Sequence, residues 1–181
     1  MTLQSQFGSE FTRNEVDAAR RPALILAAFP PDPMPSPSRR ILVVDDAHDA
    51  AETLARVLGI LGHEAQFVTD PRRAMDAAAD MRAEAAFVDI GMPHIDGYKL
   101  AALLRSKFPA QSLRLVAHTA WGREEDLARA WAAGFDAHLT KPATLPVIEG
   151  VLSRMFGGAA DETLGRHFPP ESPYRGRATG N

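Results

Sequence analysis

From residue 41 onward, short apolar runs alternate with longer stretches whose apolar residues recur every three or four positions. Runs such as Ile41-Leu42-Val43-Val44, apolar throughout and rich in β-branched residues, are typical of strands buried on both faces of a parallel sheet. The strands are predicted at residues 41–44, 64–69, 85–89, 113–118 and 135–140.

The stretches between these runs have the spacing of helices that bury one face. Their boundaries carry start and stop signals, such as Asp70-Pro71 and Pro146 at helix starts and Gly62 and Gly134 at helix ends. The predicted buried helix positions are Leu54, Val57, Leu58, Leu61, Ala74, Ala77, Ala78, Met81, Leu100, Leu103, Leu104, Val147, Val151, Leu152 and Met155. Five strands alternating with five helices predict βαβ units with right-handed crossovers, and so a doubly wound α/β domain with a five-stranded parallel sheet.

This alternating domain, residues 40–156, is flanked by two segments of different composition. Residues 1–39 hold six prolines between positions 22 and 37 and are expected to be a Pro-rich tail or linker, with one short helix at 13–28. Within it, Gly8-Ser9-Glu10-Phe11 resembles a cloning remnant and carries no functional weight. Residues 157–181 lack a periodic apolar pattern and are expected to form a disordered C-terminal tail.

Composition narrows the classes of function. The 181 residues are 45% hydrophobic and 24% charged, which suits a globular domain that buries its own core. A formal net charge of -3 gives no electrostatic case for nucleic acid or an anionic membrane as a partner. The chain has no Cys, which excludes thiolate chemistry and Cys-bound zinc, and it has no apolar run of the roughly 18 residues that span a bilayer. We expect a cytoplasmic protein.

Polar residues of a few types follow four of the predicted strands. They are Asp45, Asp46, Asp89, Thr119 and Lys141. Each alone has an ordinary interpretation as a helix cap, a turn hydroxyl or a solvated lysine. In a doubly wound fold, however, ligands bind beyond the carboxyl ends of the strands, where these residues would gather. Three carboxylates, a hydroxyl and an amine at one edge describe a Mg²⁺ site beside a bound oxyanion, with one carboxylate available as a nucleophile for acyl-phosphate formation.

Four motifs together resemble the receiver domain of two-component response regulators, of the chemotaxis-receiver kind. They are Val43-Val44-Asp45-Asp46, Val88-Asp89-Ile90-Gly91-Met92-Pro93 with Asp96-Gly97, Ala117-His118-Thr119-Ala120, and residues 133–142. The resemblance covers residues 40–156 and implies a flavodoxin-like fold with strand order 2-1-3-4-5. It also implies that Asp89 is the phosphoacceptor and that Asp45 and Asp46 hold Mg²⁺ together with Asp89 and the Gly91 carbonyl.

On the opposite side of the expected site, the resemblance implies that Thr119 and Lys141 bind the phosphoryl group. It further implies a cis peptide bond at Lys141-Pro142. The chain departs from the family pattern three residues before the lysine, where a Tyr or Phe that swings inward on activation is common and His138 stands instead. This histidine is either a partly exposed residue on an outer strand or an altered, pH-sensitive switch.

Two further positions lie at the mouth of the site in this family. They are Gly91, two residues after the phosphoacceptor, and Trp121, two residues after the threonine. We hypothesise that Gly91 opens one side of Asp89 to water or to the phosphoryl donor while Trp121 partly covers the other, so that both residues tune the lifetime of the phosphoryl group. Simple packing of Trp121 on its loop is the alternative.

By resemblance, the chain takes a phosphoryl group from a histidine kinase or a His-containing phosphotransfer protein and signals through its fourth helix, fifth strand and fifth helix, within residues 113–156. It would not be an enzyme, because it catalyses only its own phosphotransfer and autodephosphorylation. We expect a single-domain response regulator, a monomer or weak dimer, with no direct DNA binding. The alternatives are a receiver detached from a hybrid kinase or larger regulator, and a non-phosphorylated adaptor. An Mg²⁺ phosphatase is disfavoured because Gly91 stands where a second acid/base carboxylate is expected.

Overall fold

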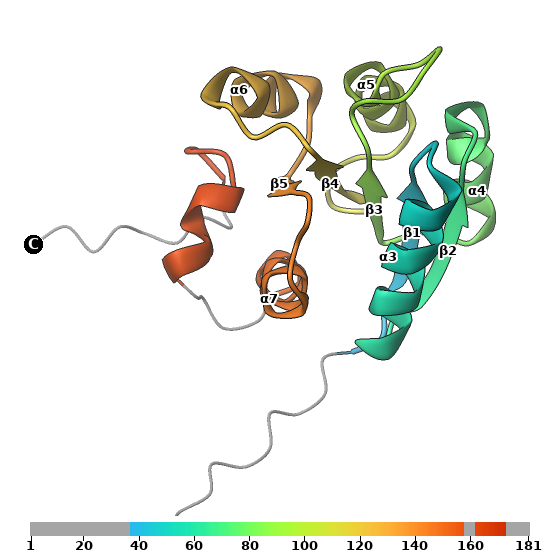
Figure 1. Cartoon of the computed structure of the whole chain (residues 1–181), viewed down its shortest axis with the longest axis horizontal. Coiled ribbons are helices and arrows are strands. Elements are labelled where there is room, and N and C mark those ends of the chain that lie inside the picture. Colours follow the sequence, from blue (N-terminus) through green and yellow to red (C-terminus); the bar gives the residue numbers. More distant parts are fainter. Residues whose placement is uncertain (1–36, 158–161, 173–181) are drawn as a thin grey trace, which may run out of the picture. The chain divides into compact units, whose positions relative to one another are not determined.

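A five-stranded parallel sheet forms the centre of the computed structural model, which describes residues 37–157 and 162–172. The predicted helix at 13–28 lies outside the described residues. The strands are β1 (Arg40–Val44), β2 (Glu64–Val68), β3 (Ala85–Val88), β4 (Arg114–Thr119) and β5 (Ala137–Thr140). They lie in the order β2-β1-β3-β4-β5 and all pairs are parallel, which confirms the predicted fold (Figure 1).

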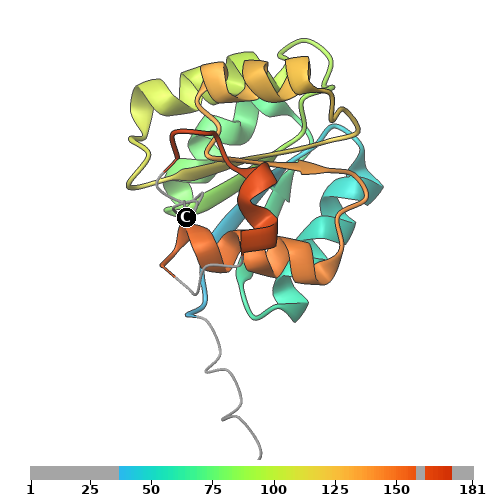
Figure 2. The same ribbon diagram turned by 90° about the vertical axis from the view of Figure 1, so that its left-hand side faces the viewer.

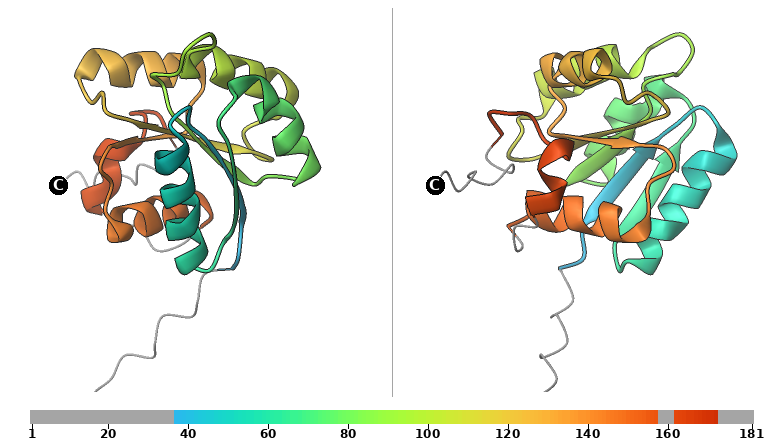
Figure 3. Two further views of the ribbon diagram at one scale, coloured as in Figure 1. Left: turned by 45° about the vertical axis from the view of Figure 1, so that its right-hand side comes forward. Right: turned by 60° about the vertical axis from the view of Figure 1, so that its left-hand side comes forward.

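Helices cover both faces of the sheet, as a doubly wound chain requires. They are α3 (His48–Ile60), α4 (Ala74–Asp80), α5 (Gly97–Lys107), α6 (Glu124–Ala133) and α7 (Leu145–Met155), with a short 3-10 helix, η1 (Pro71–Arg73), before α4. One apolar core lies between the sheet and α4, α5 and α6, and a second lies between the sheet and α3 and α7 (Figure 3). Because both faces are covered, every residue of β3 is buried, as its uninterrupted apolar sequence predicted.

The helix boundaries follow local signals, and the structure corrects the prediction at one helix start and at one side chain expected to be buried. Asp70 accepts a hydrogen bond from the Arg72 N–H, so the predicted cap is present, but it starts η1 rather than the α-helix itself. Leu103, predicted to be buried, is 48% exposed, because Leu100 and Leu104 already face the sheet from α5. Among the described residues, no helix is both long and apolar enough to cross a lipid bilayer.

The prediction of a disordered C-terminal tail is wrong for residues 162–172. This segment contains a 3-10 helix, η2 (Glu162–His167), and its Leu164 and Phe168 side chains belong to the same apolar core as α3 and α7. Two apolar residues four positions apart, as Leu164 and Phe168 are, give too short a pattern to mark a helix by periodicity alone.

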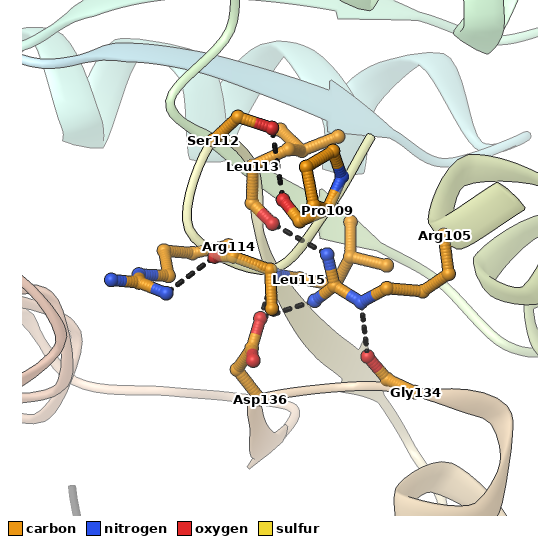
Figure 4. A network of polar contacts seen from close by, with 9 residues as sticks. Arg105, Pro109, Ser112, Leu113, Arg114, Leu115, Gly134 and Asp136 are labelled. Carbon is orange, nitrogen blue, oxygen red and sulfur yellow. Dashed lines mark hydrogen bonds and ion pairs between the residues drawn. The ribbon is translucent and has the colours of Figure 1, made fainter. Parts of the chain in front are cut away.

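A polar network closes the edge of the sheet at which β4 and β5 begin. The Arg105 guanidinium, at the end of α5, donates to the Gly134 carbonyl at 2.8 Å, to the Leu113 carbonyl at 2.6 Å, and to the Asp136 carboxylate (Figure 4). The same carboxylate accepts the Leu115 N–H at 2.8 Å. Burial raises the pKa of Asp136, and Arg105 opposes that rise. One arginine therefore ties α5 to the chain leading into both strands.

We expect Asp136→Ala to lower the free energy of unfolding by about 2–4 kcal/mol, because it leaves a largely buried guanidinium without its carboxylate. Urea denaturation at pH 7 measures the change. Asp80→Ala, at an exposed carboxylate on α4, is the control and should change it by less than about 0.5 kcal/mol. Equal values for the two variants would contradict a structural role for the network.

Candidate functional site

The predicted site residues come together at the carboxyl edge of the sheet. Asp45 and Asp46 directly follow β1, Asp89 directly follows β3, and Lys141 directly follows β5. Thr119 is the last residue of β4 and is buried. The parallel register places these strand ends side by side, so the candidate site follows directly from the topology.

Three carboxylates form a cluster that fits a hard divalent cation. One ligand oxygen from each of Asp45, Asp46 and Asp89 lies within 4.8 Å of the others. Asp45 is buried and accepts the Ala47 N–H at 3.0 Å, which fixes its carboxylate, whereas Asp46 is exposed. Carboxylate oxygens in this arrangement are the ligand type that Mg²⁺ prefers. The donor set therefore fits the predicted metal.

Lys141 lies against two of these carboxylates. Its Nζ atom is 2.6 Å from Asp45 Oδ2 and 3.2 Å from Asp89 Oδ1. Burial alone would lower the pKa of Lys141, but the hydrogen bond that Lys141 donates to Asp45 and the charge of Asp89 together hold that pKa above its usual value. Burial raises the pKa of Asp89, the Lys141 charge opposes that rise, and the Asp45 charge adds to it. The amine is thus a fixed cation that stabilises two crowded carboxylates.

The backbone around Asp89 is held by a close approach of Gly97, the first residue of α5. A Cβ atom added to Gly97 would lie 2.7 Å from the Ile90 Cα and closer still to the Asp89 carbonyl oxygen. The Gly97 N–H donates to the Ile90 carbonyl at 3.0 Å, and the preceding Asp96 caps the helix by accepting the Lys99 N–H. The Asp96-Gly97 pair therefore positions the loop that carries Asp89. Only glycine fits at position 97, because any Cβ atom there would clash with the backbone of Asp89 and Ile90.

Gly91 and the Trp121 ring lie next to each other beside Asp89, rather than on two separate sides of it as hypothesised. A Cβ atom added to Gly91 would lie 3.6 Å from Asp89 Oδ2 and 3.9 Å from Trp121 Cζ2, so the indole ring extends to the open side of the carboxylate. The Trp121 N–H donates to Thr119 Oγ1 at 3.3 Å, and the Trp121 side chain is 47% exposed. The ring therefore lies at the mouth of the site rather than in the core.

His138 is buried, so its interpretation as a partly exposed residue on an outer strand is wrong. Its residue is 2% exposed, and its ring packs edge to face against Trp131 of α6 with a centroid distance of 6.3 Å. The His167 ring of the C-terminal segment lies at the His138 carbonyl oxygen, which closes the outer side of β5. Burial lowers the pKa of His138, and the Trp121 backbone opposes that shift.

One titratable residue beside the site and one direct contact within it were not predicted from the sequence. His118 on β4 stacks edge to face on Phe87, and burial, reinforced by the Lys141 charge, lowers its pKa to about 4. Its position directly before Thr119 in a central strand was the sequence signal that could have indicated a buried histidine beside the site. The contact between Lys141 and Asp45 could not be seen in the sequence, because the two residues are far apart in the chain. The predicted cis peptide bond at Lys141-Pro142 is confirmed.

Comparison with known proteins identifies the family. Residues 41–152 match the model of the response regulator receiver domain. The chain belongs to this family. Its receiver domain therefore includes all the site residues described above.

Curated relatives include both response regulators and a sensor kinase. Response regulator MprA of Mycolicibacterium vanbaalenii is 35% identical over 116 residues, which cover 64% of this chain and 48% of that protein. MprA of Mycobacterium sp. strain KMS is 34% identical over 134 residues, covering 74% of this chain and 54% of that protein. Sensor histidine kinase RcsC of Escherichia coli K12 is 33% identical over 113 residues, covering 62% of this chain and 12% of that protein. The chain thus spans about half the length of the MprA relatives it matches.

Solved structures share the receiver fold. Chemotaxis protein CheY4 of Vibrio cholerae superposes with a TM-score of 0.61 at 22% identity, covering 65% of this chain and 98% of that one. The co-crystal structure of the Saccharomyces cerevisiae phosphotransfer protein Ypd1 with the receiver domain of Ssk1 contains a chain that matches with a TM-score of 0.60 at 20% identity, covering 66% of this chain and 89% of that one. At these identities the likeness shows the fold alone.

The depressed pKa of His118 predicts acid sensitivity of the receiver domain. As the pH falls from 6.5, the ordinary value, toward about 4, an unfolded His118 binds a proton that the folded protein does not. The free energy of unfolding should therefore fall through this window, by up to about 1.4 kcal/mol per pH unit for this residue. Urea denaturation between pH 7 and pH 5 should show a shallower pH dependence for His118→Asn than for the wild type. An equal pH dependence of the free energy of unfolding in the two proteins would contradict a lowered pKa of His118.

Proposed function

We propose that the chain is the phospho-acceptor of a two-component phosphorelay, with Asp89 as the phosphorylated residue. The observation that carries this proposal is the position of the Asp89 carboxylate, 3.2 Å from the Lys141 amine and within reach of Asp45 and Asp46. A carboxylate nucleophile in phosphoryl transfer needs nearby cations, because both it and the phosphoryl group are negative. The site provides one cation directly and the ligands for another.

In the proposed step, an Asp89 carboxylate oxygen bonds to the phosphorus of a phosphohistidine donor. The phosphorus–nitrogen bond breaks at the same time, and its electron pair stays on the donor imidazole. Lys141 and the Thr119 hydroxyl, both at the strand ends beside Asp89, would bind the oxygens of the transferred phosphoryl group. Hydrolysis of the resulting acyl phosphate by water restores the carboxylate, so the protein would act only on its own phosphoryl group.

Asp45, Asp46, Asp89 and the Gly91 carbonyl are the groups we assign to Mg²⁺. When bound, Mg²⁺ supplies positive charge that offsets the negative charge of the phosphoryl oxygens. The acidic cluster described above supports this assignment through its donor type and its spacing.

We infer that the phosphoryl donor is a histidine kinase or a His-containing phosphotransfer protein. The Ypd1–Ssk1 co-crystal structure, which pairs a histidine phosphotransfer protein with a receiver domain, supports this class of partner. The match to a small part of RcsC supports the alternative that this receiver works within a longer protein. Signalling through the surface formed by α6, β5 and α7, in the cytoplasm, is part of the same proposal.

We expect Asp89→Asn to abolish phosphorylation, because a neutral amide oxygen is a poor nucleophile. Wild-type protein incubated with Mg²⁺ and acetyl phosphate should gain one phosphate by intact mass spectrometry, and hydroxylamine should release it, as expected of an acyl phosphate. Asp76→Asn, at an exposed carboxylate on α4, is the matched control and should behave like the wild type. Phosphate uptake by the Asp89→Asn protein would contradict the proposal.

We expect Trp121→Ala to speed autodephosphorylation severalfold, because removing the indole opens the covered side of Asp89 to water. Gly91→Asn should slow it, because a side chain at this position would lie next to Asp89 Oδ2 and the Trp121 ring and hinder the approach of water. Loss of the phosphate over time, followed by mass spectrometry after removal of acetyl phosphate, measures both rates. Trp131→Phe, at the other tryptophan, is the control. Unchanged rates in both site variants would leave Trp121 as a simple packing residue.

A further inference from the structure

The C-terminal segment of residues 162–172, here called the strap, covers the edge of the sheet at β5. Its helix η2 lies over β5 and α7, with α6 on the far side (Figure 2). Leu164 and Phe168 are 6% and 2% exposed and belong to the same apolar core as Leu139 of β5 and Val151 of α7. The strap therefore occupies part of the surface through which we propose that the receiver signals.

The surface beneath the strap is shaped to hold it. A Cβ atom added to Gly150 of α7 would lie 2.6 Å from the Leu164 Cδ1, so the glycine leaves the space that Leu164 fills. The guanidinium of Arg154 lies 5.3 Å from the centre of the Phe168 ring. The His167 Nδ1 lies 2.9 Å from the His138 carbonyl oxygen and donates to it, since a carbonyl can only accept. Two apolar side chains, a cation–π contact and a hydrogen bond are thus among the contacts that attach the strap to β5 and α7.

The strap also lies near the loops that follow the site residues Thr119 and Lys141. A cavity of about 420 Å³ separates it from the loops that follow β4 and β5. The cavity lining includes Gly122, His138, Thr140, Pro142, Arg166 and His167. The loop after Thr119 packs directly on the end of β5, because a Cβ atom added to Gly122 would lie 2.8 Å from Thr140 Oγ1. A movement of either loop toward Asp89 therefore changes the surface against which the strap lies.

Phosphorylation would change the contacts of Lys141 at the end of β5 and so favour such a movement. Lys141 is held by Asp45 at 2.6 Å and by Asp89 at 3.2 Å, and a phosphoryl group on Asp89 would compete with Asp45 for the amine. Pro142, next in sequence, forms part of the cavity wall. The strap itself buries two apolar side chains, Leu164 and Phe168, and its only regular element is a short 3-10 helix, whose hydrogen-bond geometry is poorer than that of an α-helix. Small changes at the end of β5 can therefore shift its docking equilibrium.

We propose that the strap is an internal ligand of the α6–β5–α7 surface, docked while Asp89 is free and released when Asp89 carries a phosphoryl group. A downstream protein then reaches this surface in the phosphorylated state, by placing two apolar side chains of a helical turn where Leu164 and Phe168 lie. This inference rests on the proposed phosphorylation of Asp89. By thermodynamic reciprocity, removing the strap must favour the phosphorylated state by the same factor by which phosphorylation favours release.

Docking is tested with a pair of helix glycines in the full chain. Gly150→Leu fills the space of Leu164, whereas Gly59→Leu places the same side chain on α3, where an added Cβ meets no atom within 4 Å. Trypsin cleavage after the exposed Arg166, identified by mass spectrometry, reports how often the strap is open. We expect cleavage in the Gly150→Leu protein to be about tenfold faster or more than in the wild type, and unchanged in the control. A second pair, Leu164→Ser and the exposed Leu103→Ser, should give the same contrast. Equal cleavage in all variants would overturn strap docking.

Coupling is tested with beryllofluoride and Mg²⁺, which mimic the phosphoryl group on an aspartate. Binding is followed by Trp121 fluorescence in a Trp131→Phe background. We expect beryllofluoride to speed wild-type cleavage after Arg166 about fivefold or more, and to bind the Gly150→Leu protein more tightly by the same factor. Equal affinities with unchanged cleavage would overturn the coupling but leave the proposed function intact. Lack of binding, together with lack of phosphate uptake from acetyl phosphate, would overturn both, while the cleavage contrast without ligand still measures docking.

Discussion

The ion pair that Lys141 makes with Asp45 and Asp89 is the interaction on which the site depends. Two strands separate β5, which carries the lysine, from β1, which carries Asp45. The pair can form only when the register of all four strands is correct, so it is a product of the whole sheet rather than of one loop. It also sets the charge balance, because a single amine holds two of three crowded carboxylates. The remaining negative charge, carried by clustered carboxylate oxygens, fits a divalent cation at this edge.

The central part of the fold could be predicted from the sequence because its determinants are local. Uninterrupted apolar runs marked the strands, and the alternation with helical spacing required parallel strands with crossovers. The site residues were predictable for the same reason, since each follows a strand directly and parallel strands end at one edge. Asp89 and Thr119 could therefore be placed at one site although they lie far apart in the chain.

What the sequence did not reveal depends on contacts between distant segments. The burial of His138 results from Trp131 of α6 and from the strap, neither of which is adjacent in sequence. The strap buries only two apolar side chains, and Gly150 leaves the space for one of them, Leu164. In the sequence, a glycine within a helix indicates only lower helix stability. Similarly, the role of Gly97 is visible only once α5 is seen against the Asp89 backbone.

The position of the strap has a consequence for the behaviour of the protein in concentrated solution. An edge strand with free backbone groups is a template for pairing with another chain, and proteins commonly protect such edges with helices or loops. Here β5 is an outer strand of the sheet, and the contacts that hold the segment beside it include those of Leu164, Phe168 and His167. Conditions that detach this segment uncover both a strand edge and an apolar surface. Under the proposed release of the strap, the same residues would control both solubility and signalling state, and crowding should favour association of the detached form.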